Sequence, residues 1–374
     1  QFGFRAGLST DTAIACFTDK IRSFIDNGNI ARSVFVDFTK AFDSIDHFIL
    51  FRKLQYYGIT GPALTLLQSF LLNRLQVVSV DNFTSSPNPI TRGVPQGSIL
   101  GPLLFLLFIN DLPRCLNYSS CLLYTDDTTL FSHHLDLATL VSRLQADLNC
   151  LVDWCNCNRL LINPCKTCFM LFYSPNKKLS FIPYLNVNSV VIPLSDHTSF
   201  LGVIMDTHLK FQQHINSVCK KISYGIRALV KSRMCFNIET LKALYYAFIH
   251  SHLSYCITSW GNSYSVHIWP LKVLQKQAIR LITFASRQAP SHAIFCQLDL
   301  LPISQMYVYN VCVLFFKIFH RTLTIDIFSI TLLDNSNNIR FSVAHNLLLP
   351  KVRTNYGKIS IAFSSISLWN FFIT

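Results

Sequence analysis

The chain has 374 residues, of which 51% are hydrophobic, 14% are charged and 31 are Phe; this predicts two or three domains with a large core and excludes disorder as the main state. Lys and Arg outnumber Asp and Glu by 32 to 19, and the resulting net charge of +13 predicts a polyanionic partner such as nucleic acid. The longest clean apolar run, 99–109, is much shorter than the ~20 residues that a spanning helix needs, so no membrane partner is predicted.

Short apolar strands alternate with amphipathic helices in the first half of the chain. Ser9 or Thr10 can cap a helix over 11–27 whose apolar residues share one face, and Gly28 ends it. The next predicted elements are a strand at 33–37, helices at 47–57 and 61–73, and a hairpin over 76–85. This alternation favours a mixed fold in which helices cover a sheet.

The second predicted group of elements contains another hairpin. We expect a buried helix over 98–111, hairpin strands at 121–124 and 128–132, a helix over 135–158 and a strand at 167–173. From residue 211 onward the chain is mostly helical and basic. The order predicts an α+β fold, in which a split βαβ-type antiparallel sheet precedes an all-helical module.

Three acidic residues stand at the ends of predicted strands. Asp37 ends the strand at 33–37, and Asp126 and Asp127 lie in the tight turn of the second hairpin. Carboxylates from separate strands repel each other, and a divalent cation bound through hard oxygen ligands relieves that repulsion. The alternative is that Asp126 and Asp127 are ordinary turn residues.

Residues 93–102 form a loop rich in Gly and Pro that leads into a helix, with the amide of Gln96 near its middle. Its glycines allow close approach of another chain. The sequence Gln1-Phe2-Gly3-Phe4-Arg5, the block 36–43, this loop and Tyr124-Thr125-Asp126-Asp127 occur in the order seen in reverse transcriptases. The chain therefore resembles the reverse transcriptases of non-LTR (LINE-type) retrotransposons.

Further segments agree with this resemblance. Phe200-Leu201-Gly202-Val203 resembles the primer-grip motif, and the region 263–320 resembles the helices that follow the thumb in LINE-type elements. The residues that resemble the motif after the acidic hairpin are Trp154, Asn158, Leu160, Asn163, Lys166 and Thr167. Group II intron maturases and telomerase are the related polymerases that remain as alternatives.

The resemblance implies a right-hand polymerase fold in three parts. Residues 1–205 would form partial fingers and the palm, 206–262 a helical thumb, and 263–374 a mainly helical C-terminal region. The implied activity is RNA-directed DNA synthesis, in which two Mg²⁺ ions, with Mn²⁺ as an alternative, support addition of dNTPs to a DNA primer on an RNA template. No stable protein partner is predicted, and the expected location is intracellular, in the nucleus, the cytoplasm or both.

The resemblance also assigns roles to residues. Asp37, Asp126 and Asp127 would bind the metal ions, and Lys166 would protonate the departing pyrophosphate, a solvated lysine being its alternative. Phe38, Phe42 and Gln96 would contact the nucleotide, with Phe42 excluding the 2′-hydroxyl; a core aromatic is the alternative for Phe42. The expected template and primer contacts are Arg5, Gly97, Phe200, Leu201, Gly202, Lys220, Lys221 and Arg227.

Two features depart from the family's pattern. Thr125 stands where the family has alanine, and we expect it to be tolerated because a β-branched residue suits a strand. The family's earlier finger motifs should lie before Gln1, so the chain is expected to be a fragment. A catalytically incomplete, nucleic-acid-binding remnant is therefore the alternative function.

The basic excess is concentrated in the second half. Between residues 205 and 290 there are eleven basic residues against Asp206 and Glu239 alone. Within this segment Lys220, Lys221 and Arg227 can share one helix face. The apolar residues expected to face the core are Ile215, Val218, Ile222 and Ile226. We therefore expect a helix that faces phosphates on its basic side.

The 13 cysteines are too sparse for a disulfide scaffold, and no signal peptide is apparent, which favours a reducing compartment. Cys155, Cys157, Cys165 and Cys168 have the spacing C-x-C and C-x₂-C, which is not that of a standard zinc finger. Core positions for Cys155 and Cys168 are the preferred interpretation.

Overall fold

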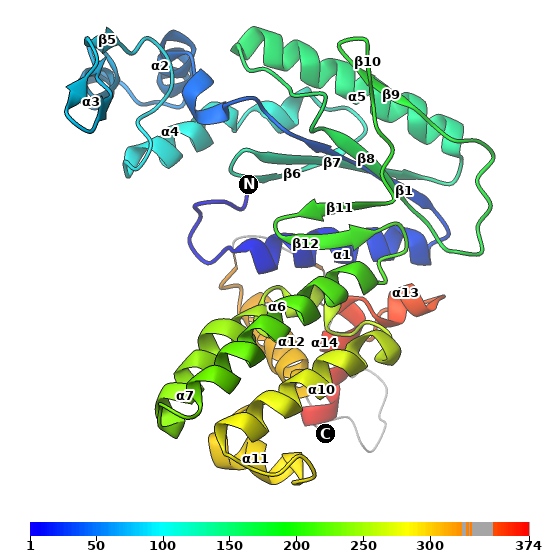
Figure 1. The fold of residues 1–374 in the computed structure, drawn as a ribbon. Helices are drawn as coiled ribbons and strands as arrows, with labels where there is room; N and C mark the ends of the chain where they lie inside the picture. The colour runs from blue at the N-terminus through cyan, green and yellow to red at the C-terminus, as the bar shows by residue number, and fades with distance from the viewer. Residues whose placement is uncertain (324–326, 329, 331–346, 374) are drawn as a thin grey trace. The chain divides into compact units, whose positions relative to one another are not determined.

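A computed structural model describes residues 1–323, 327–328, 330 and 347–373. The chain divides into two compact units (Figure 1). The first unit comprises Gln1–Ala6, Ile30–Leu171 and Lys178–Ser195, and the second comprises Gly7–Asn29, Phe172–Lys177 and Asp196–Thr374.

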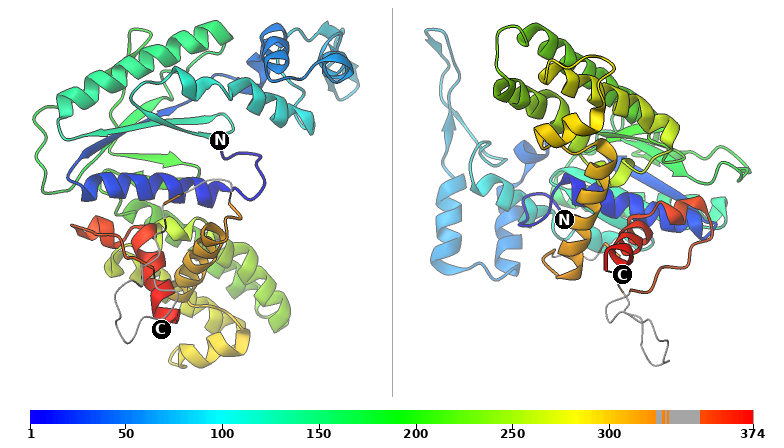
Figure 2. Two further views of the ribbon diagram at one scale, coloured as in Figure 1. Left: turned by 180° about the vertical axis from the view of Figure 1, so that it is seen from behind. Right: turned by 90° about the horizontal axis from the view of Figure 1, so that it is seen from below.

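A four-stranded sheet forms the centre of the first unit. Its strand order is β6 (Ser120–Tyr124), β7 (Asp127–His134), β1 (Ile30–Val36) and β8 (Cys168–Phe172), and β7 pairs antiparallel with both β6 and β1. Helix α5 (Leu137–Asn158) packs on β7 and β1 along one face of this sheet (Figures 1 and 2). Its core-facing residues, spaced three or four apart as on one face of a helix, are Leu137, Leu140, Leu144, Leu148, Leu151 and Cys155.

The remaining elements of the first unit are short. The helices are α2 (His47–Tyr56), α3 (Gly61–Leu71), α4 (Leu100–Ile109) and the 3₁₀ turns η1 (Ala41–Ser44) and η2 (Leu112–Cys115). The two-stranded pairs are β2 (Leu75–Gln76) with β5 (Asn88–Pro89), β3 (Ser79–Val80) with β4 (Phe83–Thr84), and β9 (Leu185–Val187) with β10 (Val190–Ile192). The hairpin expected over 76–85 is therefore the β3–β4 pair, and β2 and β5 extend it.

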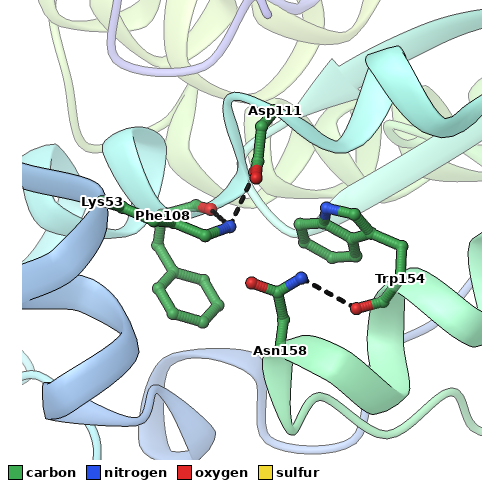
Figure 3. A network of polar contacts seen from close by, with 5 residues as sticks. All are labelled: Lys53, Phe108, Asp111, Trp154 and Asn158. Carbon is green, nitrogen blue, oxygen red and sulfur yellow. Dashed lines mark hydrogen bonds and ion pairs between the residues drawn. The ribbon is translucent and has the colours of Figure 1, made fainter. Parts of the chain in front are cut away.

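A partly buried lysine links α2, α4 and α5 (Figure 3). Lys53 Nζ donates hydrogen bonds to Asp111 Oδ1 at 2.6 Å and to the Phe108 carbonyl at 2.7 Å, and it lies 4.8 Å from the centre of the Trp154 ring. Burial lowers the pKa of Lys53, and the Asp111 carboxylate opposes that shift. Asn158 Nδ2 donates to the Trp154 carbonyl at 2.8 Å. Trp154 and Asn158, two residues of the motif after the hairpin, thus have structural contacts.

The second unit is mostly helical. Its sheet is the hairpin β11 (His197–Phe200) and β12 (Val203–Asp206). Its longer helices are α1 (Thr10–Asp26), α6 (Gln212–Ser232), α7 (Ile238–Tyr245), α10 (Ser265–Ile282), α11 (Ser291–Leu298), α12 (Ile303–Phe319) and α14 (Ile361–Ile373). The shorter helical segments are η3 (Tyr246–His250), α8 (Ser251–Ser254), α9 (Ile257–Trp260) and α13 (Asn355–Lys358). Among the described residues no single helix is long and apolar enough to cross a membrane, although α11 and α12, bent by 47°, pass that test as a pair.

Three buried polar residues of α1 bind other segments of the second unit, most of them near the C-terminus. Asp19 accepts a hydrogen bond from the Ile361 amide, and Arg22 donates to the carbonyls of Ile359 and Ser259 at 3.1 and 2.8 Å. Asp26 accepts from the amides of Arg353 and Thr354 and from the Thr354 hydroxyl. These contacts explain why α1 groups with the C-terminal elements in one unit.

The predicted α+β fold is confirmed, and most elements lie within a few residues of their expected positions. Ser9 caps α1 as expected, because its side chain accepts from the Thr12 amide. The division at 205 and 262 into palm, thumb and C-terminal region stays a prediction. The part of the last region at 331–346 lies outside the described residues.

Candidate active site

Strand pairing brings the three acidic residues to one end of the sheet. Val36, the last residue of β1, pairs with Thr128 of β7. Asp37 directly follows Val36, and Asp127, the first residue of β7, directly precedes Thr128, so both acids lie at the same end of the sheet. Tyr124 pairs with Asp127 across the β6–β7 hairpin, which leaves Thr125 and Asp126 as its two-residue turn. Residues from distant parts of the sequence thus meet at one strand end.

The carboxylates influence one another. Desolvation by the surrounding protein, followed by the charges of Asp126 and Asp37, raises the pKa of Asp127 to about 6. Like charges gathered in this way favour proton or cation binding. The cluster therefore has the chemistry of a hard-cation site.

The cluster offers few protein ligands for a metal ion. Within the described parts of the chain, no group of three or more His, Cys, Asp or Glu side chains is arranged to hold a metal ion. The assignment of Asp37 and Asp126 as metal ligands, with Asp127 in support, stays a prediction. Mg²⁺ is commonly bound through one or two carboxylates together with substrate phosphates, and two carboxylates of this cluster fit that mode.

The turn of the acidic hairpin corrects the interpretation of Thr125. This residue lies in the turn, not in a strand, and its φ of +59° is in the left-handed region. A positive φ is what the first position of a two-residue hairpin turn requires. The conformation is unfavourable for a β-branched residue, so the strand preference of threonine does not explain why it is accepted here.

A loop from the following motif holds the backbone of Asp37. The Asn163 amide donates to the Asp37 carbonyl at 2.8 Å, and the Asp37 amide donates to the Thr167 hydroxyl at 3.2 Å. Lys166 lies between these two residues and is exposed, and its amide donates to the Asn163 carbonyl at 3.3 Å. The structure thus places Lys166 on the loop that fixes Asp37, while its role as a proton donor stays a prediction.

Phe38 and Phe42 follow Asp37. Phe38 is buried and forms a β-bridge with Ile162. The half-buried Phe42 ring stacks on Phe105, with ring centres 4.5 Å apart, and packs against the core. Phe42 therefore has the core contacts of its alternative interpretation, and sugar discrimination stays a prediction.

Gln96 lines a cavity of about 630 Å³ within the first unit. Its side-chain amide donates to Asp43 Oδ1 at 2.9 Å. Arg74 and Arg92 line the same cavity, and the sequence analysis missed both. They flank the β2–β5 segment, and the only signal for them was their position as basic residues on either side of a predicted hairpin.

The remaining template and primer candidates lie on separate elements of the two units. Arg5 is exposed and donates a long hydrogen bond of 3.4 Å to the Gln1 carbonyl, and Gly97 is an exposed loop residue. Leu201 and Gly202 form the turn of the β11–β12 hairpin with φ of +46° and +80°, the pattern of a type I′ turn. Phe200 is buried, with its ring centre 5.4 Å from that of Phe17.

Helix α6 has the predicted two faces. Lys220, Lys221 and Arg227 are exposed. The four predicted core residues, all buried, are Ile215, Val218, Ile222 and Ile226. Tyr224 also stands on the exposed side, with the Arg227 guanidinium 5.5 Å from its ring centre, and sequence reasoning did not single it out.

All 13 cysteines are free thiols. Cys155, on α5, is buried in the core as predicted, whereas Cys168, in β8, is only partly buried. Cys157 and Cys165 are exposed.

An acidic hairpin beside the acidic end of a neighbouring strand is the arrangement expected of a nucleic-acid polymerase. The comparisons with known proteins agree. The family model described as reverse transcriptase (RNA-dependent DNA polymerase) matches residues 1–205, and the chain belongs to this family.

The relatives that the chain resembles are encoded by mobile elements. It is 31% identical over 303 residues to the probable RNA-directed DNA polymerase from transposon BS of Drosophila melanogaster, a match that covers 76% of this chain and 32% of the relative. It is 27% identical over 309 residues to the RNA-directed DNA polymerase from mobile element jockey of Drosophila funebris, covering 80% of this chain and 33% of the relative. The chain thus spans about a third of the length of these relatives.

Among solved structures, the chain is similar to a telomerase from Candida albicans in complex with a fragment of telomeric RNA. The TM-score is 0.45 at 11% identity, and the match covers 79% of this chain and 55% of the telomerase chain.

Proposed function

We propose that this chain carries the polymerase active site of a non-LTR (LINE-type) retrotransposon and copies RNA into DNA. The observation that supports this most is the cluster of Asp37, Asp126 and Asp127 at one end of the sheet, where burial and then the neighbouring charges raise the pKa of Asp127 to about 6. Membership of the reverse transcriptase family supports the same activity. The substrates would be an RNA template, a DNA primer and dNTPs, and the site of action would be intracellular.

In this proposal Asp37 and Asp126 hold Mg²⁺, and Asp127 adds negative charge beside them. When bound, the ions supply Lewis-acid activation of the primer 3′-hydroxyl and neutralise the charge on the phosphates. The protein's own contribution is to hold the reacting groups in line, which accounts for much of the rate in phosphoryl transfer. Asn163 and Thr167 fix the backbone of Asp37 for this purpose.

The other candidates take roles around this cluster. Lys166, on the loop that fixes Asp37, would give a proton to the departing pyrophosphate. Gln96, Arg74 and Arg92 line one cavity, and two guanidinium groups there suit the phosphates of a template or nucleotide. Leu201 and Gly202, at a hairpin tip, would contact the primer.

Primer extension on an RNA template, measured with this chain and Mg²⁺, tests the proposal. Asp126→Asn keeps the size of the side chain and removes one charge, so extension should fall on the order of 10³-fold, which corresponds to about 4 kcal/mol of transition-state stabilisation. Asp81→Asn, at an exposed position of the β3–β4 turn, is the matched control and should extend like wild type. Mn²⁺ should raise the melting temperature of wild type more than that of Asp126→Asn.

Equal extension by wild type and Asp126→Asn would contradict the assignment of the site. If wild type does not extend a primer and yet binds primer–template duplexes in a salt-dependent way, the chain is a nucleic-acid-binding remnant without catalysis.

A further inference from the structure

A cavity in the second unit is lined by three arginines from separate segments. Arg233 follows α6, Arg280 lies in the last turn of α10, and Arg287 lies in the loop between α10 and α11. The cavity has a volume of about 530 Å³, within the size range of ligand sites. We call it the arginine pocket; its other walls include Val273, Gln277 and Leu281.

No acid offsets these three charges. Neither Asp nor Glu lines the arginine pocket, and within the described parts of the chain none of the three arginines forms an ion pair. Gathering like charges in a concave site is unfavourable by itself and becomes favourable when an anion binds. The guanidinium group matches phosphate oxygens in a two-point geometry that lysine does not offer.

Two of the arginines are held in position. The Arg233 guanidinium lies 4.9 Å from the centre of the Phe284 ring, and its buried Nε has no hydrogen-bond partner. Arg280 donates from Nε and Nη2 to the Ala289 carbonyl at 3.1 and 2.8 Å, which fixes the loop that carries Arg287. The pocket is thus pre-organised.

The surface of α10 indicates what kind of phosphate binds. Trp269 is 60% exposed, and Lys276 Nζ lies 5.9 Å from the centre of its ring. Trp269, Val273, Lys276 and Arg280 are spaced by four, three and four residues, so they share one face of the helix. An exposed aromatic ring and a basic pocket along one face are the elements that bind unpaired nucleic-acid strands, since bases stack on the ring and phosphates bind the cations.

The buried side of the same helix has a separate, structural role. Gln275 is buried and donates to the Tyr245 hydroxyl and the Leu301 carbonyl, both at 2.9 Å, while its Oε1 accepts from the Ile303 amide. These contacts satisfy Gln275 inside the protein. Trp269 of the same helix is instead 60% exposed.

We infer that the arginine pocket binds a backbone phosphate of a single-stranded nucleic acid, with a base of the same strand stacked on Trp269. This site lies beyond residues 1–205, which match the polymerase family, and does not depend on the polymerase chemistry. Single-strand binding at α10 would give the protein a second nucleic-acid contact, separate from the acidic cluster.

Intrinsic tryptophan fluorescence and anisotropy of labelled 12-mers test the inference with the full chain. The probes are oligo(U) RNA and oligo(dT) DNA, unlabelled for fluorescence and labelled for anisotropy, together with 20 mM inorganic phosphate. Comparison of RNA with DNA identifies the preferred strand. Trp269 should be quenched on binding, because it is exposed and stacks on a base. Trp269→Phe should retain most of the affinity and lose the quenching, whereas Trp269→Ala should lose both, with affinity reduced about tenfold.

The arginines are tested by Arg233→Gln/Arg287→Gln. The double variant should bind single strands about tenfold more weakly and lower the slope of log affinity against log salt by about 0.7, the value for one phosphate contact on a single strand. Lys351→Gln/Lys358→Gln, two exposed lysines in the same unit, is the control with matched charge and should change neither value. Arg287→Gln alone, at an exposed loop position, replaces the double variant if that variant fails to fold.

Three results would overturn the inference. The first is that the arginine variant and its lysine control bind with equal affinity. The second is that Trp269→Ala shows unchanged quenching. The third is that 20 mM phosphate displaces the oligonucleotide from this site, which would identify a small-anion site. Asp126→Asn should bind single strands like wild type, so failure of the polymerase proposal and failure of this one are distinguishable.

Discussion

Gly3 lies directly against Thr125 in the turn of the acidic hairpin. A methyl group added at Gly3 would stand 2.5 Å from the Thr125 hydroxyl and 2.7 Å from its amide nitrogen. The adjacent Phe2 amide donates to the Leu123 carbonyl at 2.8 Å, so the N-terminal segment runs along β6 and reaches the turn. The glycine of the Gln1–Arg5 motif thus has a physical role, since only hydrogen at this position leaves room for the turn that carries Asp126.

Gly3→Ala should displace this turn. Overpacking of this kind costs about 1–3 kcal/mol, so the melting temperature should fall and primer extension should fall more than duplex binding. Thr125→Ala is the control, because alanine tolerates a positive φ better than threonine and should leave stability equal or slightly higher. The double variant Gly3→Ala/Thr125→Ala should recover the melting temperature only in part, because the contact of the added methyl group with the Thr125 amide nitrogen remains. A Gly3→Ala protein with wild-type stability and extension would show that the segment moves freely.

The acidic cluster should make the effect of metal ions depend on pH. The folded-state pKa of Asp127 is raised to about 6, above the ordinary value near 3.9, so the folded protein holds this proton more tightly than the unfolded chain does. The contribution of Asp127 to stability therefore falls as pH rises from about 4 to about 6, and the full repulsion is present above pH 6. Mn²⁺ should raise the melting temperature clearly at pH 7.5 and little at pH 5.

Asp127→Asn separates this effect from other titrations. In EDTA at pH 7.5 the variant should melt at a higher temperature than wild type, because a desolvated charge that two neighbouring charges repel is gone, and the difference should shrink toward pH 4. Mn²⁺ should raise the melting temperature of Asp127→Asn less than that of wild type. A pH-independent difference between the two proteins in EDTA would mean that folding does not raise the pKa of Asp127.

The sequence predicted those parts of the site that depend on local pattern. Asp37 and Asp126 could be placed at strand ends because apolar runs precede them, and the faces of α6 followed from helical spacing. The conformation of Thr125 was mispredicted, since a residue's β-propensity does not reveal that it occupies a turn with positive φ. Arg74, Arg92 and Gln96 line the same cavity only because the chain between them folds back. No local sequence pattern shows this.

Long-range partners were the least predictable part of the fold. Arg32 is fully buried in β1, with its guanidinium 4.1 Å from the centre of the Phe169 ring, and burial lowers its pKa to about 9. The charge of Arg32 alone suggests an exposed side chain. Its burial depends on the strands and helices that pack around β1, and local sequence does not show these. Arg22 likewise donates to a carbonyl 337 residues away, which spacing within α1 cannot show.

The basic face of α6 predicts a salt-dependent affinity for duplexes. Replacing Lys220, Lys221 and Arg227 by Ala should weaken binding of primer–template duplexes of any sequence and flatten the slope of log affinity against log salt by up to about 3. Folding should survive, because all three side chains are exposed while the apolar stripe of α6 is kept.

Replacing Lys178, Lys351 and Lys358 by Ala removes the same charge from other exposed positions and is the control for that triple variant. Its salt slope should stay close to that of wild type. If the two triple variants flatten the slope equally, the effect comes from net charge and not from a binding face.

The contacts of Asp26 predict that the C-terminal segment is needed for the stability of the second unit. This buried carboxylate accepts hydrogen bonds from the amides of Arg353 and Thr354 and from the Thr354 hydroxyl. Asp26→Ala leaves these donors without a partner and should cost about 3 kcal/mol, because each unsatisfied donor that is shielded from water costs about 1–3 kcal/mol. Asp26→Asn keeps one acceptor oxygen and should cost less. Limited proteolysis should cut within 347–373 faster in both variants, in the order Ala before Asn.

Glu239→Ala, an exposed acid of the same unit, is the matched control and should change stability by no more than about 0.5 kcal/mol. The protease separates two explanations of a lower melting temperature. If Asp26 acts by holding the C-terminal segment, cleavage within 347–373 should precede cleavage elsewhere in the second unit. Cleavage that begins at the same rate throughout that unit would instead mean that Asp26 stabilises α1 itself, and that the segment at 353–354 follows passively.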